Sequence, residues 1–135
     1  MKYLLDTNIC IYLIKKNPHS VVARFNEHAV GDIGVSSITV AELSYGVQKS
    51  QRQTQNQEAL LQFLSPLIIA GFDTNAAAIS YGQIRAELES QGTSIGSLDT
   101  LIAGHAASMN VTLVTNNIRE FSRVHGLIVE NWVEN

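Results

Sequence analysis

Short apolar runs alternate with longer stretches of helical periodicity along this chain. Runs at 3–5, 32–36, 67–72, 111–115 and 128–132 predict five strands, the last at a sheet edge. The stretches between them predict six helices. The first ends near Lys15, and four others cover 20–28, 38–46, 74–91 and 98–109. The remaining helix begins within 48–57 and stops before Pro66. Strands that alternate with helices are typical of an α/β fold, so we expect a doubly wound, mostly parallel twisted sheet flanked by helices.

Polar residues and glycines mark the predicted helix ends. Ser20 and Ser97 are the expected N-caps of two helices, and Asp73 or Thr74 is expected to cap the long helix that Gly92 ends. These signals place each helix between two strands without a long unstructured loop.

The length of 135 residues predicts a single domain, 1–135. No apolar stretch reaches the roughly 20 residues of a membrane span, and the N-terminal run lacks a small-residue cleavage site, so we expect a cytoplasmic protein. Cys10 is the only cysteine, which excludes an internal disulfide and a multi-cysteine zinc site and favours a buried thiol.

Four acidic or amide residues lie at or just past the ends of apolar runs: Asp6, Glu42, Asp99 and Asn117. The carboxyl ends of parallel strands and the first turns of the adjoining helices meet at one edge of an α/β sheet. Oxygen ligands of this kind suit hard cations such as Mg²⁺ and Mn²⁺. The pattern therefore predicts a divalent-metal site.

Each of these residues also has a structural explanation. Asp6 could serve only as an N-cap, and Glu42 lies three residues after Thr39, as in a capping box. Asp99 would lie two residues after Ser97, where the helix dipole favours an ionised carboxylate. The metal site rests on the group as a whole rather than on any single member.

Two further features leave alternatives open. His105 could act as a general base, but it points about 120° away from Asp99 on the same helix, which favours packing or hydrogen bonding. The net charge of −3 opposes binding to nucleic acid, yet one bound Mg²⁺ would change −3 to −1 and two would change it to +1. Charge alone therefore does not decide the class of partner.

Six segments together resemble the PIN-domain ribonucleases, and most closely the VapC toxins of bacterial toxin–antitoxin pairs. They are Leu4-Leu5-Asp6-Thr7-Asn8, Ser37-Ile38-Thr39-Val40-Ala41-Glu42-Leu43 with Gly46, Gly82-Gln83-Ile84-Arg85-Ala86-Glu87-Leu88, Ile95-Gly96 with Asp99, Ile102-Ala103-Gly104-His105-Ala106, and Val114-Thr115-Asn116-Asn117 with Arg119-Glu120-Phe121. The resemblance extends from Tyr3 to Trp132.

The resemblance implies a Mg²⁺- or Mn²⁺-dependent endoribonuclease, usually a homodimer, that a VapB-like antitoxin inhibits. By matching motif, Asp6, Glu42 and Asp99 are the implied catalytic and metal-binding carboxylates. Asn117 stands where many relatives have a fourth acid, for which Glu120 is the nearby substitute, and Thr7 and Asn8 adjoin the site. The segment around Asn117 resembles relatives that cut initiator tRNA in the anticodon loop, so tRNA is the implied substrate.

Three rival functions remain. A haloacid-dehalogenase-like phosphatase needs a second Asp where this chain has Asn8, and a receiver domain does not account for the distant Glu42. The third rival is a PIN domain with little catalytic activity that acts as a binding partner, which the neutral Asn117 motivates.

Overall fold

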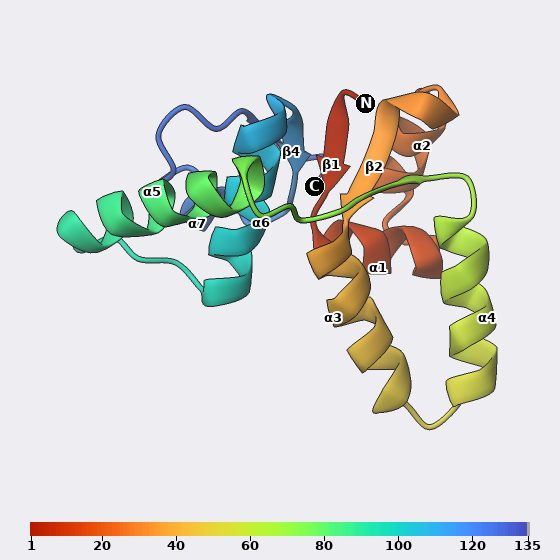
Figure 1. Ribbon diagram of the computed structural model, residues 1–135. Helices are drawn as coiled ribbons and strands as arrows, with labels where there is room; N and C mark the ends of the chain where they lie inside the picture. Colours follow the sequence, from red (N-terminus) through yellow and green to blue (C-terminus); the bar gives the residue numbers. More distant parts are fainter. Residues whose placement is uncertain (135) are drawn as a thin grey trace.

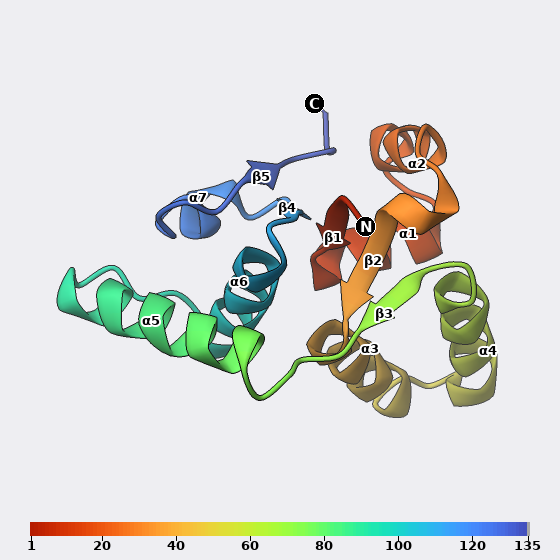
Figure 2. The same ribbon diagram turned by 45° about the horizontal axis from the view of Figure 1, so that its top comes forward.

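The computed structural model describes residues 1–134, so the last residue of the predicted domain lies outside the described residues. A five-stranded sheet has the order β3-β2-β1-β4-β5, and all neighbouring strands are parallel (Figures 1 and 2). The strands are β1 Tyr3–Leu5, β2 Ile33–Ser36, β3 Ile68–Ala70, β4 Thr112–Val114 and β5 Val129–Glu130. The predicted α/β fold with a parallel, doubly wound sheet is confirmed.

Helices connect the strands in the predicted alternation. They are α1 Thr7–Lys15, α2 His19–Asn26, the 3₁₀ turn η1 Val30–Asp32, α3 Ser37–Gln48, α4 Gln53–Leu64, α5 Ala76–Ser90, α6 Ser97–Met109 and α7 Ile118–Phe121. Within residues 1–134, none of these helices has the length and apolar character needed to cross a bilayer.

Successive strand residues point to opposite faces of the sheet. Because apolar residues of the strands point to both faces, helices cover both. Leu5 packs with the apolar side chains of α1 to α4, whereas its neighbour Leu4 packs with those of α5, α6 and α7. On the second face, α5 and α6 approach closely at Gly104, where a Cβ atom would come within 2.8 Å of the Tyr81 backbone. The result is a three-layer α/β/α arrangement.

The strand order reverses at β1, which makes its carboxyl end the switch point of the sheet. The chain runs from β1 outward through β2 to β3, and then returns to the other side of β1 for β4 and β5. Crevices at such reversals are where open α/β sheets bind ligands. Asp6 directly follows β1 and Thr115 directly follows β4, so both lie at this crevice.

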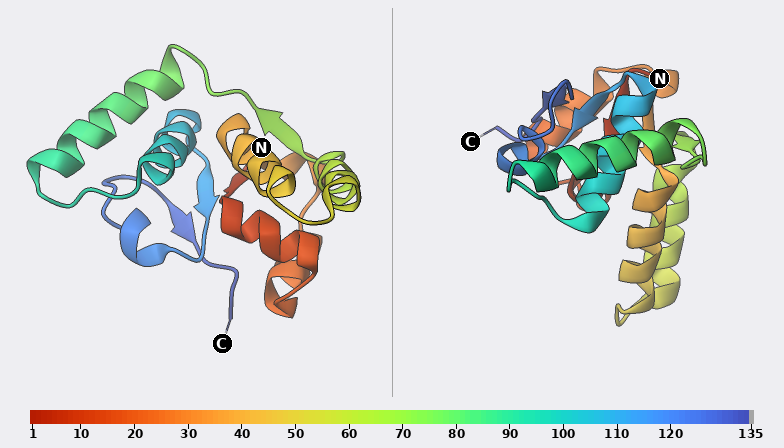
Figure 3. Two further views of the ribbon diagram at one scale, coloured as in Figure 1. Left: turned by 90° about the horizontal axis from the view of Figure 1, so that it is seen from below. Right: turned by 60° about the vertical axis from the view of Figure 1, so that its left-hand side comes forward.

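Helices α3 and α4 form an arm that extends from the carboxyl end of the sheet (Figures 1 and 3). The buried residues Leu43, Val47 and Leu60 hold the two helices against the core. The tip between them is the short segment 49–52, and the helix start predicted within the polar stretch 48–57 is confirmed at Gln53.

Two predicted helix caps are wrong. Helix α2 begins at His19 with Pro18 at the N-cap position, and the Ser20 hydroxyl instead accepts a hydrogen bond from the Glu134 backbone. Gly96 is the N-cap of α6, and Ser97 is its first residue. In both cases the chain enters the helix one or two residues earlier than the capping side chain suggests.

Helix α5 begins at Ala76, later than predicted, with Asn75 at the N-cap position. Asp73 still supplies the predicted capping contacts, because its carboxylate accepts hydrogen bonds from the Ala76 and Ala77 backbone at 3.1 and 2.7 Å. The outer strands β3 and β5 are shorter than the predicted 67–72 and 128–132. At the end of β3, the Phe72 N–H donates to the Ser37 hydroxyl instead of to a neighbouring strand.

Candidate functional site

Asp6 is a buried carboxylate at the switch point, with only 5% of its surface exposed. Its Oδ1 accepts a hydrogen bond from the Thr7 backbone and its Oδ2 accepts one from the Thr115 hydroxyl, both at 2.7 Å. Burial raises the pKa of Asp6 above its usual value, although these two hydrogen bonds oppose the shift. Asp6 is both the N-cap of α1 and a carboxylate held rigidly at the crevice.

Glu42 does not form the capping box that was its alternative structural explanation. Helix α3 begins at Ser37, and the Ser36 hydroxyl caps it by accepting from the Ile38 N–H at 3.0 Å. Thr39 is therefore inside the helix, and Glu42 lies in its second turn, beyond reach of the free backbone N–H groups. Instead, Oε1 of Glu42 accepts a hydrogen bond from the Thr7 hydroxyl at 2.9 Å.

Asp99 lies in the first turn of α6 and is partly buried. Its pKa is raised to about 6, first by burial and then by the negative charges of Asp6, Glu120 and Glu42, while hydrogen bonding from Asn117 lowers it. Burial and the neighbouring acids thus raise the pKa of Asp99 despite its place at a helix N-terminus, and the carboxylate is still mostly ionised at pH 7. The shift places the four acids within one electrostatic cluster.

Asn117 and Glu120 complete this cluster from the loop after β4 and from α7. The Asn117 amide donates to Oε2 of Glu120 at 3.2 Å, and its backbone N–H donates to the Thr115 hydroxyl at 2.9 Å. Asn8 is exposed, and no hydrogen bond joins its side chain to the acids within the described residues. We therefore leave Asn8 outside the site.

Thr115 was not singled out by the sequence as a site residue. Its hydroxyl donates to Asp6 and accepts from the Asn117 backbone, so it joins the ends of β1 and β4 across the crevice. A side chain that can both donate and accept is needed there. The sequence feature that could have identified Thr115 as a site residue is its position directly after a buried strand.

His105 is buried and links two elements that carry acids. Its Nδ1 lies 2.8 Å from the Ser36 hydroxyl, and its ring packs edge-on against Phe72. Burial lowers the pKa of His105, which favours the neutral ring. The predicted packing and hydrogen-bonding role is confirmed, and it fixes α6 relative to the start of α3.

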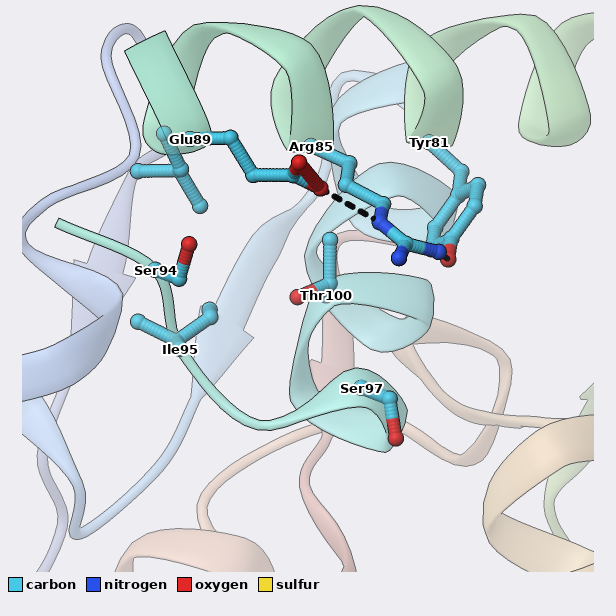
Figure 4. Close-up of a pocket in the computed structure, with 8 residues that line it drawn as sticks. Tyr81, Arg85, Glu89, Ser94, Ile95, Ser97 and Thr100 are labelled. Carbon is cyan, nitrogen blue, oxygen red and sulfur yellow. Dashed lines mark hydrogen bonds and ion pairs between the residues drawn. The ribbon is translucent and has the colours of Figure 1, made fainter. Parts of the chain in front are cut away.

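Two hollows lie near these helices. A groove of about 300 Å³ between α1, α3 and α4 is lined by apolar side chains with Thr7 and Glu42 at its edge. A smaller hollow of about 130 Å³ separates α5 from the start of α6, where Arg85 donates to Glu89 and Tyr81 (Figure 4). Only the groove adjoins the acidic cluster.

The buried thiol of Cys10 is not a nucleophile. Burial, together with the charge of Asp6, raises its pKa well above the usual value, so the reactive thiolate is not formed. The prediction of a buried structural cysteine is confirmed.

The chemistry of the cluster suits a hard divalent cation. All its side chains present oxygen atoms, and within residues 1–134 no Lys, Arg or His forms an ion pair with Asp6, Glu42, Asp99 or Glu120. In the same residues, no three His, Cys, Asp or Glu side chains are close enough to enclose an ion by themselves. By the chemistry of its oxygen donors the cluster fits Mg²⁺, which commonly binds one or two carboxylates and completes its coordination with waters and substrate phosphate.

The fold and the cluster define an open α/β domain with acidic side chains at its switch point, the place where such sheets commonly bind ligands. The PIN domain model matches residues 3–127. Ribonuclease VapC2 of Rickettsia felis is 50% identical over 133 residues, covering 98% of both chains. The tRNA(fMet)-specific endonuclease VapC of Shigella flexneri is 48% identical over 132 residues, also covering 98% of both.

Solved structures give the same result. The chain matches the DNA-bound VapBC of Salmonella typhimurium with a TM-score of 0.93 and 45% identity, over 98% of this chain and 99% of that one. It matches VapBC2 of Rickettsia felis, bound to a promoter DNA fragment, with a TM-score of 0.92 and 49% identity over 98% and 100%. The chain belongs to the PIN-domain family, among its VapC ribonucleases. This membership excludes the phosphatase and receiver alternatives.

Proposed function

We propose that this chain is a Mg²⁺- or Mn²⁺-dependent endoribonuclease toxin that cuts initiator tRNA in the anticodon loop and is inhibited by a VapB-like antitoxin. The observation that carries the catalytic part is the group of acids around Asp99, which has no cationic partner within residues 1–134. Burial and then the charges of these acids raise the pKa of Asp99 to about 6. Relatives named as tRNA(fMet)-specific endonucleases support the substrate.

In this proposal, Asp6 and Asp99 hold the metal, and Glu42 contributes directly or through water. The ion supplies Lewis-acid stabilisation of the charge that develops on the phosphodiester. Thr115 and Thr7 hold the carboxylates of Asp6 and Glu42 in fixed orientations through their hydroxyls. Such partners of metal ligands matter because they limit the rearrangement that binding requires.

The residues at the crevice also define the expected products. No side chain in the cluster is a strong nucleophile, so water attacks phosphorus while the bond to the 3′ oxygen breaks. The products would carry a 5′-phosphate and a 3′-hydroxyl.

The antitoxin is proposed to occupy the groove beside Glu42. Ile11, Leu43 and Leu60 give this groove an apolar floor, whereas Lys15 and Glu42 make it polar at the edges. An amphipathic segment fits a surface of this kind. An Arg on that segment would pair with the carboxylates. The solved VapBC complexes of two relatives support such a partner.

The proposal is tested by expressing the chain without its partner and sequencing the 5′ ends of RNA fragments. Growth arrest and 5′-phosphorylated cuts in the initiator tRNA anticodon loop are expected, and co-expression of the antitoxin encoded beside it should suppress both. The same fragments from an Asp99→Asn variant would show that the cleavage comes from another enzyme. A purified complex that cuts as fast as the free chain would contradict the inhibition.

A PIN domain with little catalytic activity remains the second candidate, because Asn117 adds no charge to the cluster. Calorimetric titration separates the two candidates, since the binding-only domain would take up Mn²⁺ weakly or not at all. For the enzyme, we expect one tight site and a second that is weak without RNA, because substrate phosphate supplies oxygens to Mg²⁺ sites.

Replacing Asn117 by Asp should tighten the second metal site without abolishing cleavage. The new carboxylate would lie beside Glu120, where the amide now donates at 3.2 Å. Their repulsion in the metal-free chain should be relieved when a cation binds. Glu120→Gln should weaken the same site. Two equally tight sites in the unmodified chain, or no response to either substitution in the titration, would rule this arrangement out.

A further inference from the structure

One face of α3 carries four residues in a continuous stripe: Ile38, Glu42, Tyr45 and Lys49. Their spacing of four, three and four residues places them on the same side of the helix. Ile38, at the start, packs against the apolar cluster of α5 and α6, and Glu42 acts electrostatically on Asp99. Helix α3 itself runs from the end of β2 along the projecting arm (Figure 1), so the stripe leads from Ile38 near the sheet toward Lys49 on the arm.

Tyr45 is highly exposed for an aromatic residue beside a catalytic cluster. About 66% of its surface is accessible, and Nζ of Lys49 lies 5.1 Å from its ring centroid. The apolar groove beside Glu42 is lined by Leu43, Gly46 and Val47 and does not include Tyr45. Tyr45 is therefore not part of the groove assigned above to the antitoxin, although its stripe neighbour Glu42 lines that groove.

The charge along the arm changes sign beyond the cluster. Residues 43–57 contain Lys49 and Arg52 and no acid, although the chain as a whole has a net charge of −3. An exposed aromatic ring beside a cation is the usual combination for binding single-stranded nucleic acid, because bases stack on the ring and the cation binds a phosphate. The position fits a strand that continues from the bond cut at the cluster.

We propose that Tyr45 and Lys49 bind the RNA strand next to the cleaved bond, with a base stacked on Tyr45 and a phosphate on Lys49. This inference rests on the proposed ribonuclease activity and assigns its substrate contact. Tyr45 and Lys49 take no part in the chemical step, so their loss should weaken RNA binding and leave the rate at saturating RNA nearly unchanged.

The test measures the binding of an anticodon stem-loop RNA by fluorescence anisotropy in an Asp99→Asn background, and the kinetics of the same substitutions in the active chain. Tyr45→Ala should raise Kd and KM about tenfold, with kcat changed less than twofold, whereas Tyr45→Phe should behave as the unmodified chain because it still stacks. Leu61→Ala, at another exposed apolar residue of the arm, is the matched control and should change neither value.

Lys49→Gln gives a second readout. Loss of one phosphate contact to a single strand should reduce the slope of log Kd against log salt by about 0.7. Lys2→Gln, at the amino end of β1 beside Asp32, is the charge control and should leave the slope unchanged.

The outcomes separate this inference from the proposed function. If the unmodified chain does not cut the RNA, the proposed function itself fails. If it cuts the RNA and Tyr45→Ala binds and cuts it equally well, only the assignment of Tyr45 fails. If Tyr45→Ala changed the oligomeric state measured by light scattering but not the RNA affinity, Tyr45 would contact a second copy of this chain. That result would overturn the inference.

Discussion

Replacing Asp99 by Asn should abolish RNA cleavage and raise the melting temperature of the metal-free protein. The substitution keeps the size of the side chain but removes a charge that burial and three neighbouring acids disfavour. Loss of a metal-binding charge should lower the cleavage rate on the order of a thousandfold. Scanning calorimetry without metal and an RNA cleavage assay with Mg²⁺ measure the two effects.

The pH dependence follows from the pKa of about 6 in the folded chain, against 3.8 in the unfolded one. Between these values the folded chain holds a proton that the unfolded chain releases, so the contribution of Asp99 to stability falls as pH rises from 4 through 6. Asp99→Asn should therefore gain most in melting temperature above pH 6. Added Mn²⁺ should stabilise the unmodified chain and have a much smaller effect on the variant.

Asp73 is a control in which the pKa shift, and therefore the effect of pH on stability, has the opposite sign. Its carboxylate accepts hydrogen bonds from the Ala77 and Ala76 backbone, which lower its pKa. Asp73→Ala should therefore lower the melting temperature above pH 4 and leave RNA cleavage intact. If Asp99→Asn also lowered the melting temperature and retained cleavage, Asp99 would be a structural residue of the helix terminus.

The sheet was predictable from the sequence because its strands are short, buried and separated by helices. Leu4 and Leu5 pack into opposite layers, which explains why β1 is apolar throughout rather than alternating. The exact ends of the helices were less predictable. Ser20 and Ser97 have side chains suited to capping, but the helices begin at His19 and at Ser97, with Pro18 and Gly96 at the N-cap positions.

The cluster was predictable in outline and not in its internal contacts. Asp6, Glu42 and Asp99 come together because their elements converge on the switch point beside β1. The hydrogen bonds of Thr115 to Asp6 and of Thr7 to Glu42 join residues 109 and 35 positions apart. No local pattern encodes such pairs, because they depend on how the strands and helices are ordered in space.

The raised pKa of Asp99 could not be predicted from its helix position alone. A first-turn carboxylate is normally stabilised as the anion by the helix dipole. Here burial and the charges of Asp6, Glu120 and Glu42 oppose that stabilisation and raise the pKa to about 6. The same repulsion that destabilises the metal-free cluster favours uptake of a cation, which relates the stability of this fold to its proposed chemistry.

Replacing Glu42 by Gln should reduce cleavage on the order of a hundredfold while the melting temperature stays unchanged or rises slightly. Ser36 caps α3, so Glu42 has no role at the helix end. Gln retains an oxygen that accepts the hydrogen bond from Thr7 but lacks the charge that raises the pKa of Asp99. The pH at which Asp99 loses its proton, followed by NMR, should therefore decrease.

Thr7→Val is the matched variant, because it keeps the Glu42 charge and removes only the hydroxyl that orients it. Loss of a partner of this kind should weaken Mn²⁺ affinity or activity about ten- to a hundredfold. Unlike Glu42→Gln, it should leave the charge acting on Asp99 in place, so the pKa of Asp99 should remain near 6. Wild-type cleavage and Mn²⁺ affinity in Glu42→Gln would instead mean that Glu42 serves only to anchor α1 to α3 through Thr7.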